Sequence, residues 1–110
     1  MVRHVILWKL KDELTHGEKE AVKEDIRAGL EGLKGRIPGL LKIKVYTEGL
    51  PGSNMDLMLD SVFADEESLK GYAVHPEHVA VAEGRVRPYA AVRNCMAIRG
   101  TNRHLEAGIQ

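Results

Sequence analysis

The fold is decided by one stretch near the start of the chain, Val2-Arg3-His4-Val5-Ile6-Leu7-Trp8-Lys9-Leu10. An extended backbone here would direct alternate side chains to two faces. One face would hold His4, Ile6, Trp8 and Leu10, and the other Arg3, Val5, Leu7 and Lys9. This two-residue period predicts a β-strand. Because large apolar side chains occupy both faces, we expect the strand to lie in a sheet that is covered on both sides.

A helix is predicted after this strand. Thr15 and, three residues later, Glu18 form the signature of a capping box, which marks a helix start. Apolar residues then recur at helical spacing until Gly35 and Pro38, so we predict a helix over residues 16–34. The residues on this apolar face are Val22, Ile26, Leu30, Leu33 and Ile37.

Two further strands are predicted before the next helical region. Residues 41–47 alternate, and their apolar face consists of Leu41, Ile43, Val45 and Thr47. Turn-forming residues at 50–54 separate this strand from a third one over residues 55–63. On the third strand, Leu57, Leu59, Ser61 and Phe63 share one side.

The last third of the chain predicts two helical segments and a final strand. Asp65 can cap a helix whose inward residues are Leu69, Tyr72 and Ala73. His75-Pro76 interrupts that helix and starts a second segment, which Pro88 ends. Residues 90–98 alternate as a fourth strand, in which we interpret Cys95 as a small buried residue. Residues 101–110 show no period, so we expect a terminal tail.

The order strand, helix, strand, strand, helix, strand predicts an α+β, ferredoxin-like fold, the split βαβ arrangement. In this fold, helices cover one face of a four-stranded antiparallel sheet. Because the strands are apolar on both faces, we expect the open face to pack against a second copy in a homodimer. The chain is then one domain over residues 1–100 with a C-terminal tail at 101–110.

Composition excludes several classes of partner. The 110-residue chain balances 16 Lys and Arg against 16 Asp and Glu and has no basic run, so nucleic acid is not an expected partner. No stretch approaches the roughly 20 apolar residues of a membrane span, so we expect no membrane partner either. Cys95 is the only cysteine, which excludes an intrachain disulfide and a cysteine-based metal cluster. We therefore predict a cytoplasmic protein.

Chemically active side chains are concentrated in Tyr72-Ala73-Val74-His75-Pro76-Glu77-His78. Proline is accepted in the first turn of a helix, which places His75 at the cap and His78 one turn inside. An imidazole titrates near neutrality, and beside a tyrosine in a pocket it could perform general acid–base chemistry without a cofactor. The alternative is that the two histidines only cap and solvate the helix.

Metal binding is a competing use of the same groups. His75, Glu77 and His78 supply two or three ligands, whereas a zinc or iron site needs three or four. The sequence shows no second ligand cluster, so we expect no metal and no cofactor.

Three blocks of the sequence together resemble the stress-responsive dimeric α/β barrel (Dabb) family. They are residues 3–12, Ile37-Pro38-Gly39-Leu40, and residues 72–79 with the Tyr-x-x-His-Pro-x-His motif. The resemblance covers residues 2–99 and implies a ferredoxin-like dimer whose two sheets form a barrel. Most members have no assigned activity, and the family name implies a stress-associated role. A plant branch contains a polyketide cyclase that closes a linear tetraketide by aldol condensation.

The resemblance implies particular site residues. The cyclase tyrosine and catalytic histidine match Tyr72 and His78, and a histidine on its first strand matches His4. A further pocket histidine of the cyclase falls at Leu57, which cannot transfer a proton. We therefore expect His78 as base and Tyr72 as proton donor, with His4 or His75 orienting one of them. The alternative for His4 is a strand histidine that is satisfied by a backbone or side-chain partner. The expected ligand-binding residues are His4, Trp8, Leu57, Tyr72, His75 and His78.

Three classes of function stay open at this point. The protein could bind a small organic ligand between sheet and helices, use that cavity for cyclase-like acid–base chemistry, or act as a structural stress protein through assembly. A cavity walled by His4, Tyr72 and His78 would favour the first two classes, and a filled interior the third. Arg93 and Asn94 on the last strand are either exposed or directed at the ligand.

Overall fold

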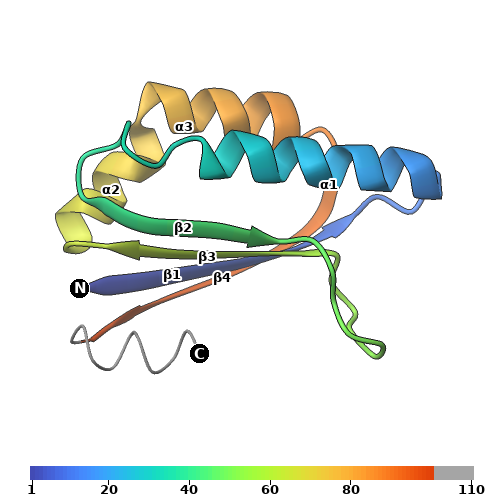
Figure 1. Ribbon diagram of the computed structural model, residues 1–110, viewed down its shortest axis with the longest axis horizontal. Coiled ribbons are helices and arrows are strands. Elements are labelled where there is room, and N and C mark those ends of the chain that lie inside the picture. The colour runs from blue at the N-terminus through green and yellow to red at the C-terminus, as the bar shows by residue number, and fades with distance from the viewer. Residues whose placement is uncertain (101–110) are drawn as a thin grey trace.

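Four strands form one antiparallel sheet in the order β2-β3-β1-β4, with the helices on one of its faces (Figure 1). The computed structural model describes residues 1–100, and the predicted tail at 101–110 lies outside them. The elements are β1 Val2–Leu10, α1 His16–Glu31, β2 Leu40–Tyr46, β3 Leu57–Phe63, α2 Glu66–Val74, α3 Pro76–Val81, the π-helical turn η1 Ala82–Val86, and β4 Ala90–Arg99. The predicted ferredoxin-like fold is therefore confirmed.

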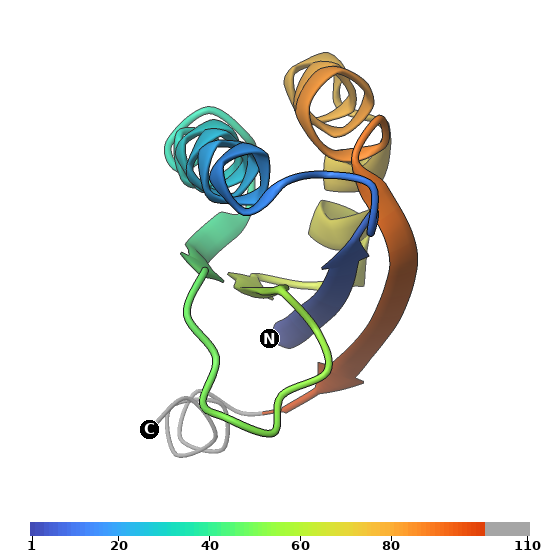
Figure 2. The ribbon, with the colours of Figure 1, turned by 90° about the vertical axis from the view of Figure 1, so that its right-hand side faces the viewer.

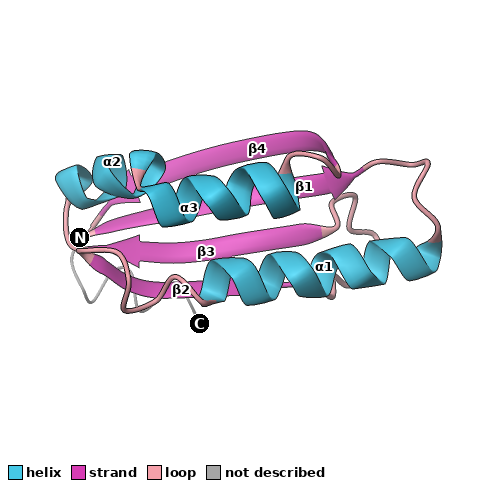
Figure 3. Cartoon of the chain, turned by 90° about the horizontal axis from the view of Figure 1, so that it is seen from above, coloured by secondary structure: helices cyan, strands magenta, loops and turns pink. Residues whose placement is uncertain are grey.

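Strand β1 is central and has the alternation expected of it. It pairs with β3 on one side and β4 on the other, and every second residue from Val2 to Leu10 is buried. These buried residues face the helices, which lie above the sheet in Figure 1 and in front of it in Figure 3. The residues between them are only half-buried.

The helix starts follow the predicted capping. At the start of α1, the Glu18 amide donates to Thr15 Oγ1 at 3.2 Å and the Thr15 amide donates to Glu18 Oε1 at 2.9 Å. Asp65 caps α2 by accepting a hydrogen bond from the Ser68 amide at 2.8 Å. Helix α1 ends at Glu31 rather than at residue 34, because the chain continues in tighter turns. One of these joins the Leu33 amide to a carbonyl only three residues earlier.

Three predicted burial positions are wrong, each for a local reason. Leu41 is exposed, because a bulge between residues 40 and 42 of β2 places Leu40 inward instead. Ala73 is exposed because α2 lies near the end of the sheet and buries only a narrow stripe around Tyr72 (Figure 3). Cys95 is exposed because it lies on the edge strand β4, beyond the helices. The third strand also starts at Leu57, two residues later than predicted.

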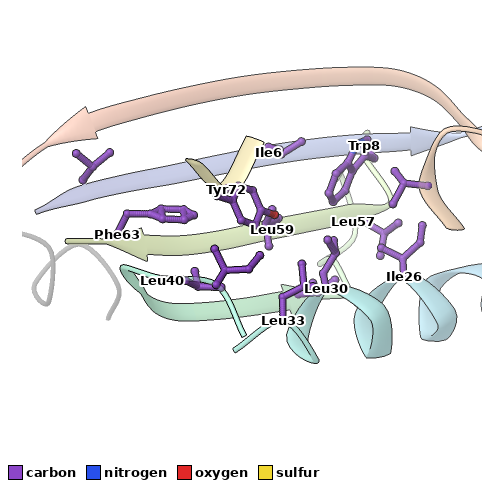
Figure 4. Close-up of a cluster of buried hydrophobic side chains, with 14 of the residues drawn as sticks. Ile6, Trp8, Ile26, Leu30, Leu33, Leu40, Leu57, Leu59, Phe63 and Tyr72 are labelled. Carbon is purple, nitrogen blue, oxygen red and sulfur yellow. The ribbon is translucent and has the colours of Figure 1, made fainter. Parts of the chain in front are cut away.

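The apolar core lies between the helices and the sheet (Figure 4). It joins β1 and β3 to α1 and α2, and its aromatic members are Trp8, Phe63 and Tyr72. The rings of Phe63 and Tyr72 lie 5.0 Å apart, and Figure 4 shows Tyr72 between Phe63 and Trp8 along the helix-facing side of the sheet. None of the helices within residues 1–100 has the length and apolar character needed to cross a bilayer.

Gly39 joins the end of the first helical region to β2 and packs against α2. Its φ is +79°, and a Cβ built on it would lie 2.0 Å from Ser68 Oγ and 2.4 Å from Ser68 Cβ. Gly35 has a similar φ of +85° with open space around it. A side chain at either position strains the backbone, but only at Gly39 does it also collide with the capped start of α2.

We expect Gly39→Ala to be clearly more destabilising than Gly35→Ala. The Gly35 variant should lose about 1 kcal/mol from backbone strain, and the Gly39 variant about 1 kcal/mol more from displacing Ser68. Urea unfolding of the two variants measures the difference. Equal losses would show that α2 moves freely and does not press on this turn.

Candidate functional site

A cavity of about 520 Å³ lies between the sheet, α1 and the α3–η1 segment. Its walls are mostly apolar, with polar groups from α2, α3 and β4. The lining residues are Ile6, Trp8, Leu30, Leu59, Tyr72, His78, Ala82, Val86, Arg87, Ala90, Ala91, Val92 and Arg93. The cavity is partly enclosed, and its size lies within the usual range of pockets for small organic molecules, about 300–1,000 Å³.

Tyr72 and His78 lie next to each other in the wall of this cavity. The break at His75-Pro76 turns α3 back beside the end of α2, so the two rings come within 4.0 Å at an angle of 31°. The Tyr72 side chain is buried, yet its hydroxyl has no hydrogen-bond partner within residues 1–100. The buried Nδ1 atom of His78 also has no hydrogen-bond partner within residues 1–100. Buried polar atoms are nearly always paired, so the cavity leaves hydrogen-bonding capacity for a guest.

The protonation states of this pair follow from burial and from nearby arginines. Burial raises the pKa of Tyr72, and the charge of Arg93 opposes that rise. Burial lowers the pKa of His78, and the charges of Arg87 and Arg93 lower it further. The carbonyls of Ala73 and Tyr72 partly offset this lowering of the His78 pKa. At neutral pH, Tyr72 is therefore a protonated donor and His78 is a neutral imidazole.

His4 lies behind this pair, on the helix-facing side of β1. Its ring is 6.5 Å from Tyr72 and 6.4 Å from Phe63, and its Nε2 is 3.1 Å from Cys95 Sγ. Burial, with the charges of Arg93 and His78, lowers the pKa of His4 to about 4. His4 is not among the cavity-lining residues, and its Nδ1 has no hydrogen-bond partner within residues 1–100.

The other predicted site residues divide between the cavity, the core and a cap. Trp8 is buried and lines the cavity. Leu57 is a core residue on β3 and does not reach the cavity. His75 caps α3, where its Nδ1 accepts a hydrogen bond from the Glu77 amide at 3.2 Å, and it lines a separate surface hollow near Pro38. Within residues 1–100, no three His, Cys, Asp or Glu side chains are grouped to hold a metal ion.

Two arginines complete the cavity, and the sequence analysis missed Arg87. It follows η1, where the Arg87 amide donates to the Ala82 carbonyl five residues earlier at 2.8 Å. This wider π turn lines the cavity with Ala82 and Val86, and π turns occur frequently at functional sites. Arg93, for which the sequence left an exposed and a ligand-facing position open, is exposed and also lines the cavity, opposite Trp8 on the helix-facing side of the sheet.

Among residues 1–100, no helix covers the opposite face of the sheet in Figure 1. The register places Val5 opposite Met96 and Leu7 opposite Met58 on this face. Met96 is 69% exposed. The loop between β2 and β3 extends on this same side of the sheet in Figures 1 and 2. Arg3 and Asp60 form an ion pair at 2.9 Å on this open face, at the end where β1 begins.

A ferredoxin-like sheet that is covered on one face, with a ligand-sized cavity beneath its helices, defines a class of small α+β domains. Within that class, the chain belongs to the stress responsive A/B barrel domain family (Dabb), whose model matches residues 2–98. Among curated proteins, none matches the chain.

Solved structures share the fold over nearly the whole chain. A dimeric protein of unknown function from Bacteroides fragilis is 31% identical, covers 90% of this chain and 95% of its own, and superposes with a TM-score of 0.84. A dimeric ferredoxin-like protein of unknown function from Thermobifida fusca is 24% identical, covers 90% of both chains and has a TM-score of 0.72. A hydroxynitrile lyase from Passiflora edulis is 15% identical, covers 92% and 94%, and has a TM-score of 0.69.

Proposed function

We propose that this protein is a homodimer that binds a small organic molecule in the cavity between sheet and helices. The observation that carries the proposal is the pair of unsatisfied polar atoms, Tyr72 Oη and His78 Nδ1, on residues that line that cavity. A guest that hydrogen-bonds to them while covering Trp8 and Leu59 would satisfy both the polar and the apolar walls. An open cavity supports binding over a purely structural role.

The dimer is part of this proposal. Its support is the set of apolar side chains on the open face of the sheet, among them the exposed Met96, together with the 31% identical relative, which is described as dimeric. A cytoplasmic location also belongs to the proposal and rests on the single cysteine. A stress-related role follows only from the family description.

Binding is tested with a panel of fragment-sized aromatic alcohols, ketones and carboxylates, followed by ligand-observed NMR and titration calorimetry. We expect at least one compound to bind and Tyr72→Phe to weaken it about tenfold, because the variant loses one hydrogen bond in a buried site. His78→Ala should weaken it similarly. Tyr89→Phe is the matched control, since Tyr89 is half-buried outside the cavity and should leave affinity unchanged.

The cavity proposal fails if Tyr72→Phe and His78→Ala bind every compound as the unmodified protein does. It also fails if no compound in the panel binds at all.

Acid–base catalysis in the same cavity is the second candidate, favoured by the contact between a neutral imidazole and a protonated phenol. His78 would remove a proton alpha to a carbonyl, and Tyr72 would donate to the developing enolate, as in a cyclase-like aldol condensation. The ring of His4 packs beside the ring of Tyr72 and would help to orient it. An enzyme of this kind exchanges the alpha protons of a bound ketone in deuterated water, whereas a binding protein does not.

A further inference from the structure

Arg93 stands out among the charged residues of the cavity. It projects from β4 opposite Trp8 and lines the cavity, but it forms no ion pair or hydrogen bond with any of residues 1–100. Most other arginines in this part of the chain are paired. Arg85 pairs with Asp25 at 3.3 Å, Arg87 with Glu83 at 3.2 Å, and Arg99 with Glu66.

The cavity has no negative charge to balance this guanidinium. Its 13 lining residues include two arginines and one histidine, but neither aspartate nor glutamate. Because Arg87 already pairs with Glu83, Arg93 has the greater capacity left for a guest. Arg93 is exposed on the edge strand and also lines the cavity, so its guanidinium can meet a guest without first breaking an ion pair.

The titration of neighbouring groups agrees with this geometry. The charge of Arg93 adds to the larger effect of burial in lowering the pKa of His4 and of His78, and it opposes the rise that burial causes in the pKa of Tyr72. Arg93 therefore acts electrostatically on all three polar groups around the cavity. A negative charge placed among them would be stabilised by the same interaction.

The apolar walls favour a guest whose negative group is attached to a ring. Trp8, Leu30 and Leu59 form one side of the cavity, where a ring system would be covered. A planar carboxylate matches the fork of a guanidinium in a bidentate pair, and a charge-assisted hydrogen bond of this kind is stronger than a neutral one. The Tyr72 hydroxyl is available as a second donor.

We propose that the cavity selects small aromatic carboxylates, with the carboxylate on Arg93 and the ring against Trp8 and Leu59. This inference rests on the proposed function, since it names the class of ligand for the same cavity. Arg93 is a specificity-determining residue in this account, and Tyr72 contributes affinity to charged and neutral ligands alike.

The test compares 2-naphthoate with 2-naphthamide, which has nearly the same shape without the charge. Titration calorimetry should show that the protein binds the carboxylate at least about tenfold more tightly than the amide. Arg93→Gln should remove that preference while the affinity for the amide stays within about twofold. Arg99→Gln loses the same charge from the same strand outside the cavity, and it should keep the preference.

Equal binding of the two probes to the unmodified protein would overturn the inference and leave the proposed ligand-binding function standing. A preference that survives Arg93→Gln would overturn it as well, by assigning the selection to another group. If neither probe binds although another compound of the panel does, the inference is overturned and the ligand-binding function stands; if no compound binds at all, both fail. Circular dichroism of Arg93→Gln confirms that a lost preference does not come from unfolding.

Discussion

Met96→Asp should convert the proposed dimer, of about twice the 12.2 kDa chain mass, into a folded monomer. Met96 is 69% exposed in the single chain, so a carboxylate there should not disturb the core. In a symmetric dimer that buries the open sheet face, the substitution occurs once in each copy. Two unpaired charges in an apolar interface cost on the order of 5 kcal/mol, or roughly a thousandfold or more in the dissociation constant.

Light scattering at micromolar concentration measures this effect, and circular dichroism reports whether the variant stays folded. Val74→Asp is the matched control, because Val74 is 75% exposed at the end of α2, on the helix side of the sheet. It should leave the mass of the assembly unchanged. A stable monomer of the unmodified protein, or a Met96→Asp variant that still dimerises through this face, would contradict the sheet-to-sheet arrangement.

Acidification should destabilise the fold through His4, by up to about 3 kcal/mol between pH 6.5 and pH 4. The pKa of His4 is lowered from 6.5 to about 4 by burial and by the charges of Arg93 and His78. Above pH 6.5 the imidazole is neutral in both states, so it adds no pH dependence. Below pH 6.5 the unfolded chain takes up a proton that the folded chain excludes, and stability falls until the pH reaches the folded pKa.

Urea unfolding at a series of pH values measures this dependence. His4→Gln cannot titrate, so its stability should fall much less steeply between pH 6.5 and pH 4 than that of the unmodified protein. His78→Gln should remove a further part of the pH dependence of stability, because the pKa of His78 is also lowered. His16→Gln is the control, since His16 is exposed at the start of α1. If the stability of His4→Gln and of the unmodified protein depended on pH in the same way, His4 would take up its proton as readily in the folded chain as in the unfolded one.

Much of the fold could be predicted because local signals and tertiary packing agree. The alternation of β1, the capping box of Thr15 and Glu18, and the Asp65 cap are local features that the tertiary structure retains. The errors arose where tertiary position overrides local pattern. Cys95 has the alternation of a buried strand residue, but the sequence does not show that the helices leave β4 uncovered.

The candidate site was only partly predictable from the sequence. Tyr72 and His78 were found because their spacing around Pro76 brings neighbouring turns together. His75 was resolved as a cap, one of the alternatives that its position before a proline left open. Arg87 and the neighbouring walls of the cavity were missed because they depend on the π turn and on how the chain returns to β4, and helical periodicity reports neither.

The π turn η1 gives this scaffold a simple way to change the shape of its cavity by altering chain length. A π turn holds one residue more than the α-helical turn it replaces, and each residue in a helix advances the direction of the side chains by about 100°. Deleting one residue from Ala82–Val86 would restore regular winding and rotate Val86 or Arg87 away from the cavity. Insertions and deletions in this segment would therefore reshape the cavity without any change in the sheet.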